Sequence, residues 1–177
     1  MSLKNLQQKC QKHLVNCAPK VLKWPALLMP FSLKKQILKR VLSTVFHEAL
    51  EDGDFKFLEH RWLKVSVTDL GIHCFLSYEA EQLLILEEHD ATDVSFSACL
   101  NDLVLIAGRK EDPDSLFFQR RLKIEGDTEL GLEVKNLIDS IDLDVLPKVM
   151  RSVLNDLALF VQKGLSNTSS ETAQTIS

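Results

Sequence analysis

The clearest hydrophobic pattern in the chain is helical and begins at Ser32. Apolar residues recur there at intervals of three and four along one face, while lysine and arginine occupy the other faces. Gly53 follows this pattern and is the type of residue that ends a helix. The apolar face comprises Leu33, Ile37, Leu38, Val41, Leu42, Val45, Phe46, Ala49 and Leu50. Such a broad stripe predicts a core helix that packs against a sheet.

Between residues 55 and 98 the pattern changes from helical to alternating. Alternation of apolar and polar side chains predicts half-buried strands, and short turns fit at 69–71 and 79–81. A further helix is expected over 101–108, where it would cover the sheet. The strand candidates are residues 55–60, 62–68, 72–78, 82–86 and 93–98.

Residues 112–132 contain several local signals in succession. An aspartate followed by a proline at 112–113 predicts the start of a short helix over 114–119. Leu122 and Ile124 then alternate with charged residues, which predicts another strand. Gly126 permits a backbone angle that other residues resist, and Asp127 can cap the next helix. The apolar face of that helix comprises Leu130, Val134, Leu137, Ile138 and Ile141.

Both ends of the chain carry amphipathic segments. Residues 3–17 predict a short basic helix, which lies either on a bilayer surface or against its own domain or a second copy. Pro147 introduces a last amphipathic helix that ends near Gly164 and either closes a cavity or fills one. Residues 166–177 have too little apolar content to fold and are expected to be mobile.

Length and composition favour one globular domain. The chain has 177 residues, of which 45% are hydrophobic, and no apolar run approaches the roughly 20 residues of a spanning helix. Its polar start predicts a cytoplasmic location, without excluding peripheral contact with the inner membrane. Four cysteines are scattered, so reduced thiols are expected. Cys10, His13 and Cys17 share a helical face but lack a fourth ligand, and we expect no metal and no cofactor.

The charge distribution is more informative than the net charge of −4. Residues 1–40 contain nine of the 21 basic residues and none of the 25 acidic ones, so the remainder carries −13. A basic segment of this kind can meet nucleic acid, an anionic membrane surface or the acidic body itself. Nucleic acid is the weakest choice, because no recognition motif accompanies the charge.

Residues 21–31 are apolar yet contain two prolines, which prevent a regular helix. Their tryptophan and leucines either cap the core or enter the membrane interface, where tryptophan beside lysine is common. The candidate membrane contacts are Lys23, Trp24, Leu27 and Leu28.

The chain lacks the usual arrangements of catalytic residues. It has no phosphate-binding glycine loop, no dinucleotide fingerprint, no serine elbow and no histidine pair at metal spacing, so we expect no enzyme. Arg120 and Arg121 follow an aromatic pair and are candidates for a headgroup contact at a pocket mouth. The alternative is a surface pair bonded to Glu125 or Asp127.

A surplus of apolar side chains is the positive functional signal. These residues come from elements that would face one another across one sheet, and such walls can enclose a ligand. A filled core would need the same residues, and the sequence alone favours that reading. The candidate lipid-binding residues are Phe75, Phe96, Leu103, Ile106, Phe117, Phe118, Met150, Val153 and Leu157.

Several motifs carry a resemblance to a known family. The runs at 93–98 (DVSFSA), 117–122 (FFQRRL), 124–132 (IEGDTELGL) and 134–137 (VKNL), with the Pro30-Phe31 pair before the helix at 34–36 (KKQ), resemble the sterol carrier protein type two family. They are most similar to a bacterial branch associated with oxygen-independent ubiquinone biosynthesis. The resemblance covers roughly residues 20 to 165.

This resemblance implies a fold and a role. The implied fold is α+β, a five-stranded mainly antiparallel sheet covered by helices around a hydrophobic lipid tunnel. The implied role is a non-enzymatic carrier that holds the polyprenyl tail of ubiquinone precursors and presents them to the hydroxylation partners UbiU and UbiV. The alternative is a protein that binds an anionic phospholipid such as phosphatidic acid in membrane lipid homeostasis.

The expected organisation has three parts. Residues 1–30 form the basic amphipathic segment, residues 31–165 the lipid-binding domain and residues 166–177 the tail. A homodimer is compatible with this organisation.

Overall fold

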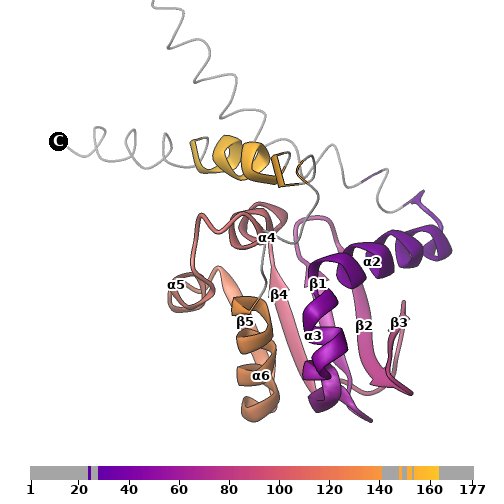
Figure 1. The fold of residues 1–177 in the computed structure, drawn as a ribbon. Coiled ribbons are helices and arrows are strands. Elements are labelled where there is room, and N and C mark those ends of the chain that lie inside the picture. Colours follow the sequence, from indigo (N-terminus) through magenta and orange to yellow (C-terminus); the bar gives the residue numbers. More distant parts are fainter. Residues whose placement is uncertain (1–23, 25–27, 141–147, 149–150, 153, 164–177) are drawn as a thin grey trace, which may run out of the picture.

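The computed structural model describes residues 24, 28–140, 148, 151–152 and 154–163 (Figure 1). The sequence-based predictions for residues 1–23, 141–147 and 164–177 therefore lie outside the described residues. The helices are α2 (Phe31–Val45), α3 (His47–Asp52), the 3-10 helix η1 (Asp54–Leu58), α4 (Leu100–Ala107), α5 (Pro113–Phe118) and α6 (Thr128–Asp139). The strands are β1 (Leu63–Val67), β2 (Ile72–Glu79), β3 (Gln82–Leu86), β4 (Val94–Ala98) and β5 (Leu122–Gly126).

The strands form one sheet in the order β3-β2-β1-β4-β5. β1 and β4 are parallel, and the other three neighbouring pairs are antiparallel. The predicted α+β fold with a five-stranded, mainly antiparallel sheet is therefore confirmed.

One face of the sheet packs against the helices. Because side chains alternate along a strand, every second side chain of β1, β2 and β4 points to this face; Leu63, Leu76 and Phe96 are examples. They meet apolar residues from η1, α5 and α6 in a single core. The fully buried members include Leu58, Ile85, Val94, Leu116 and Leu122.

The single helix predicted from Ser32 to Leu50 is two helices. The backbone breaks at Phe46, where φ is −108° and ψ is 30°. Thr44 Oγ1 donates a hydrogen bond of 2.8 Å to the Arg40 carbonyl, a contact that bends helices. After the break the Phe46 ring meets the Phe55 ring edge to face, with 5.5 Å between the centroids.

The strand predicted at 55–60 is wrong. Residues Asp54–Leu58 form η1, and only Glu59 makes an isolated bridge, to Tyr78. Gly53 has a φ of +78° and turns the chain sharply after α3, so that Phe55 and Leu58 enter the core from one side of a helical turn. The fifth strand is instead the predicted one that contains Leu122 and Ile124.

The local signals near α5 and α6 are confirmed. The Asp112 side chain accepts from Ser115 N at 3.0 Å, and Asp127 accepts from Glu129 N and Leu130 N. Gly126 has a φ of +112°, and a Cβ there would lie 2.3 Å from the Asp93 carbonyl oxygen.

The helical residues 154–163 lie over α4 (Figure 1). Val161 packs with Leu105, and Ala158 is fully buried. A Cβ on Gly108 would meet the Ala158 Cβ at 2.3 Å, so this close approach requires the glycine. Of the helices in the described residues, none is both long and apolar enough to cross a bilayer.

Candidate functional site

A groove with a volume of about 400 Å³ lies between α5, β5 and α6. Its floor is formed by β4 and β5, and its walls by the facing sides of the two helices. The apolar side chains that line it are Phe96, Pro113, Phe117, Phe118, Leu122, Ile124, Leu132 and Ile138. A mainly apolar groove of this size is typical of small-molecule and lipid sites.

Two exposed phenylalanines form one wall of the groove. The helix α5 has six residues, and Leu116 is the one that points fully into the core. The next two positions of a helix cannot share that direction, so Phe117 and Phe118 point elsewhere. Their rings lie 6.0 Å apart, and Phe118 is 81% exposed. Solvent-exposed aromatic surface beside a groove marks a contact site.

A glycine in α6 sets the distance between the helix and the sheet. A Cβ on Gly131 would lie 2.9 Å from Ile124 Cγ2. With no side chain there, α6 packs closely on β5, and both elements line the groove. Leu132, the next residue, projects at the groove and is 54% exposed.

An ion pair spans the groove from α5 to α6. Lys135 Nζ lies 2.7 Å from Asp114 Oδ2, and both residues line the groove. The hydrogen bond with Asp114 raises the pKa of Lys135. Lys135 therefore stays charged near neutral pH, and the pair links the two helix walls.

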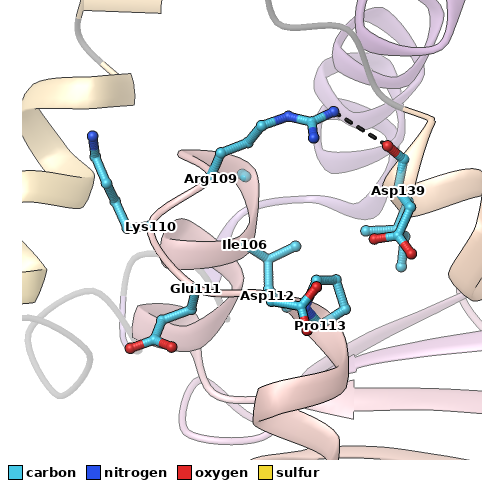
Figure 2. Close-up of a pocket in the computed structure, with 9 residues that line it drawn as sticks. Ile106, Arg109, Lys110, Glu111, Asp112, Pro113 and Asp139 are labelled. Atoms are coloured by element: carbon cyan, nitrogen blue, oxygen red, sulfur yellow. Dashed lines mark hydrogen bonds between the residues drawn. The ribbon is translucent and has the colours of Figure 1, made fainter.

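A second cavity of about 360 Å³ adjoins the groove, since Pro113 and Ile138 line both. Figure 2 shows its residues, which come from the end of α4, the segment before α5 and the end of α6. Arg109 donates a hydrogen bond of 3.2 Å to the Asp139 carbonyl across it. Its charged lining consists of Arg109, Lys110, Glu111, Asp112 and Asp139. An apolar groove therefore meets a cavity with both signs of charge.

The two arginines predicted at the mouth are placed elsewhere. Arg121 is paired with Asp102, which is only 4% exposed, and also donates to Gln119 Oε1 at 3.2 Å. Neither it nor Arg120 lines either cavity. Asp102 also accepts from the Cys99 thiol at 3.1 Å. Burial, and then this hydrogen bond, raise the pKa of Cys99 to about 11, so the thiol is neutral at physiological pH.

The predicted lipid-binding residues do not all meet. Phe96, Phe117 and Phe118 line the groove, and Ile106 lines the second cavity. Leu103 packs against the core, while Leu157 is about half exposed. Met150 and Val153 lie outside the described residues.

Phe75 does not belong with the others. It pairs with Lys64 and lies on the sheet face opposite to Leu76, which faces the helices. Its neighbours there are Lys64, whose Nζ lies 5.4 Å from the ring centroid, and the rings of His73 and His89. Successive residues of a strand point to opposite faces, so the alternation already separates Phe75 from Leu76.

Sequence reasoning missed Leu132 and the contribution of β5. Leu132 lies off the apolar face of its helix, and an apolar residue in that position was the available signal. Leu122 and Ile124 were predicted only as strand residues, yet they form the floor of the groove.

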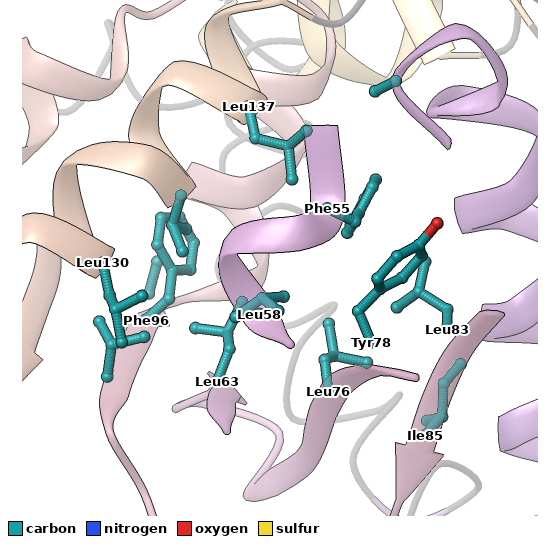
Figure 3. Close-up of a cluster of buried hydrophobic side chains, with 14 of the residues drawn as sticks. Phe55, Leu58, Leu63, Leu76, Tyr78, Leu83, Ile85, Phe96, Leu130 and Leu137 are labelled. Atoms are coloured by element: carbon teal, nitrogen blue, oxygen red, sulfur yellow. The ribbon is translucent and has the colours of Figure 1, made fainter. Parts of the chain in front are cut away.

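The groove lies at the edge of the core and not in its middle. Figure 3 shows the centre, where side chains from the sheet, including Leu63, Leu76 and Tyr78, meet Phe55 and Leu58 of η1. Phe96 and Leu130 lie toward the α6 side of this cluster. The tunnel expected between sheet and helices thus corresponds, in the described part of the chain, to an open groove beside a packed core.

Of the predicted membrane contacts, Trp24 and Leu28 are exposed. Lys23 and Leu27 lie outside the described residues.

Three comparisons place these features among known proteins. The SCP-2 sterol transfer family model matches residues 38–139. The ubiquinone biosynthesis accessory factor UbiT of Escherichia coli strain K12 is 50% identical over 167 residues, which cover 94% of this chain and 95% of that protein. UbiT of Escherichia coli O157:H7 matches to the same extent.

A solved structure of a UbiJ-SCP2 ubiquinone synthesis protein has a TM-score of 0.51, with 19% identity over 62% of this chain and 97% of that chain. This similarity concerns the fold alone. The family match and the sequence identity together cover the sheet, both groove helices and the groove itself. The chain therefore belongs to the SCP-2 sterol transfer family and, within it, to the family of the accessory factor UbiT.

Proposed function

We propose that this protein is a non-enzymatic lipid carrier and accessory factor of ubiquinone biosynthesis, and that its groove binds the polyprenyl tail of quinone precursors. The observation that carries the proposal is the apolar groove between α5 and α6 in a chain that is 50% identical to UbiT. A mainly apolar groove suits a carrier, because its ligand is held and released unchanged.

The groove supports binding of a hydrocarbon tail through burial alone. Transfer of each CH₂ group from water contributes about 0.8 kcal/mol, so a five-carbon isoprenoid unit contributes up to about 4 kcal/mol. The aromatic walls also adapt to a flexible chain with no polar groups to recognise. Affinity then depends on the apolar area that Phe117, Phe118 and Leu132 cover.

The second cavity supports a neutral head on the ligand. Its charged lining contains two cations, Arg109 and Lys110, and three carboxylates, from Glu111, Asp112 and Asp139. This balance does not favour an anion, whereas a hydroxylated ring can donate to carboxylates and accept from the cations. A quinone precursor with its tail in the groove fits both cavities better than phosphatidic acid does.

Partners and location complete the proposal. We infer that the bound precursor is presented to UbiU and UbiV for hydroxylation without oxygen, as the resemblance to this branch implies. The tail must be collected from a bilayer, so peripheral contact with an anionic membrane surface, such as the inner membrane, belongs to the same role.

Native mass spectrometry of the full chain, purified without detergent, tests the ligand. A copurified polyprenylated quinone precursor is the expected result. A diacyl phospholipid in its place would favour the alternative of an anionic phospholipid-binding protein. Binding of neither class, also after incubation with each, would overturn the carrier proposal.

A pair of variants tests the site. Leu132→Arg places a charge in the groove and should abolish the copurified tail lipid. Glu133→Arg is the matched control, since it adds the same side chain one residue further along α6, at an exposed position that does not line the groove. Equal loss of ligand in both variants would place the ligand elsewhere.

A further inference from the structure

The helix α2 carries a row of exposed apolar side chains. Leu33, Ile37 and Val41 are 45%, 49% and 40% exposed. Their spacing of four residues places them in one line along the helix. The sequence pattern predicts that all three lie on the face that packs against the sheet. Their exposure therefore differs from the prediction.

The row is exposed because the apolar stripe of α2 is wider than the surface that covers it. Phe31, Leu38 and Leu42 pack against the core, but α2 has no fully buried residue. The helix lies over the β3 side of the sheet (Figure 1) and contacts β3, so that one half of the stripe meets the core. The other half, formed by the exposed row, faces outward.

Cations border this row without any carboxylate. α2 contains Lys34, Lys35, Lys39 and Arg40 and no acidic residue. With 3.6 residues per turn, Arg40 borders the row on one side and Lys34 on the other. An apolar row between basic residues is the pattern of a helix that lies in the plane of a membrane interface.

Two described residues before α2 are also apolar and exposed. Trp24 and Leu28 are 72% and 77% exposed, and the sequence from residue 1 to 40 has no acidic residue. Tryptophan is enriched at the interface between bilayer and water.

We propose that α2 is the docking surface of this protein for an anionic bilayer, with Leu33, Ile37 and Val41 inserted among the lipids and Lys34 and Arg40 at the headgroups. The inference rests on the proposed function in one respect: a carrier of membrane lipids needs a face that meets the bilayer. Charge complementarity favours an anionic bilayer over a second copy of the chain as the partner of α2. In a dimer formed through α2, the four cations of one helix would face the same four cations of the other.

Flotation of the full chain with lipid vesicles tests the proposal. The wild type should bind vesicles of phosphatidylcholine and phosphatidylglycerol, should bind phosphatidylcholine vesicles much less, and should be released by salt. The triple variant Leu33→Gln/Ile37→Gln/Val41→Gln should bind roughly 30- to 1,000-fold more weakly, since each half-exposed side chain contributes about three- to tenfold.

A matched control lies on another face of the same helix. Ser32→Ala/Gln36→Ala/Ser43→Ala changes three exposed residues away from the row and should leave vesicle binding unchanged. The charge variant Lys34→Gln/Arg40→Gln should weaken binding by about fivefold for each cation removed. Thermal unfolding of each variant checks the fold, and the single variant Ile37→Gln replaces the triple one if the latter unfolds.

Three outcomes would overturn the docking proposal: undiminished binding by the row variant, equal loss in the control, or a wild-type dimer that the row variant converts to a monomer. Tail binding is measured separately, by titration with a fluorescent prenyl analogue in the absence of vesicles. If the wild type floats with vesicles but does not bind the prenyl analogue, only the carrier role is refuted. If it binds the prenyl analogue but does not float with anionic vesicles, only the docking surface is refuted.

Discussion

Replacement of Phe118 by alanine separates the ligand-binding role of this residue from a structural one. Complete burial of a large apolar side chain is worth about 1.5–3 kcal/mol. Because 81% of Phe118 is exposed, a ligand in the groove can bury at most that share. The corresponding loss on Phe118→Ala is about 1.2–2.4 kcal/mol of binding free energy, or roughly an 8- to 60-fold rise in Kd for a prenyl ligand.

The same substitution should hardly affect the fold. The packing that Phe118 loses is mainly its edge contact with Phe117, worth about 1 kcal/mol or less. Leu116→Ala is the contrasting variant, since Leu116 is fully buried and its truncation should cost about 2–5 kcal/mol of unfolding free energy. Fluorescent prenyl titration measures the first effect, and urea unfolding measures the second. Unchanged prenyl affinity in Phe118→Ala, or a loss of stability close to that of Leu116→Ala, would refute the reasoning.

Three further predictions concern the framework of the fold. Glu81 has a φ of +60° in the turn between β2 and β3, so Glu81→Gly should raise the unfolding free energy by up to about 1 kcal/mol in urea titration; a lower value would contradict a strained turn. Asp102→Ala removes the buried carboxylate that Arg121 and the Cys99 thiol contact and, because the Arg121 side chain is one-third exposed, should cost about 1–3 kcal/mol, whereas Asp114→Ala at a more exposed pair should leave the urea midpoint nearly unchanged; equal urea midpoints would exclude the difference. Because the pKa of Cys99 is about 11, the rate of its alkylation by iodoacetamide, followed by peptide mass spectrometry, should still rise steeply at about pH 10, where an ordinary thiol with a pKa of about 8.5 has nearly reached its plateau; a plateau at that pH would speak against burial of the thiol.

Features that depend on neighbouring residues could be predicted from the sequence. The caps at Asp112 and Asp127 and the positive φ of Gly126 each require only a few adjacent residues. The alternation in β1, β2 and β4 likewise follows from one buried face. These local signals are sufficient to identify α5, β5 and α6, which line the groove together with β4.

Features that depend on distant parts of the chain could not be predicted in this way. The segment at 55–60 has apolar residues that suit a strand, but the turn at Gly53 and the contact of Phe46 with Phe55 make it a 3-10 helix. The exposure of Leu33 depends on how much of α2 the sheet covers. A pattern of apolar residues predicts that one face of an element is apolar. Which other element covers that face depends on the whole fold.

If the protein carries a polyprenyl tail as proposed, the size of the groove determines how much of that tail it can hold. At roughly 30 Å³ for each water-sized group, a volume of about 400 Å³ accommodates about 13 heavy atoms, or between two and three isoprenoid units. A longer polyprenyl tail therefore extends past the exposed Phe118, and its remaining units need cover from another apolar surface. In that role a bilayer would supply such cover during transfer, and a protein partner would supply it during hydroxylation. An open groove with aromatic side chains at its edge allows both exchanges, because the tail can leave sideways without being drawn through a closed tunnel.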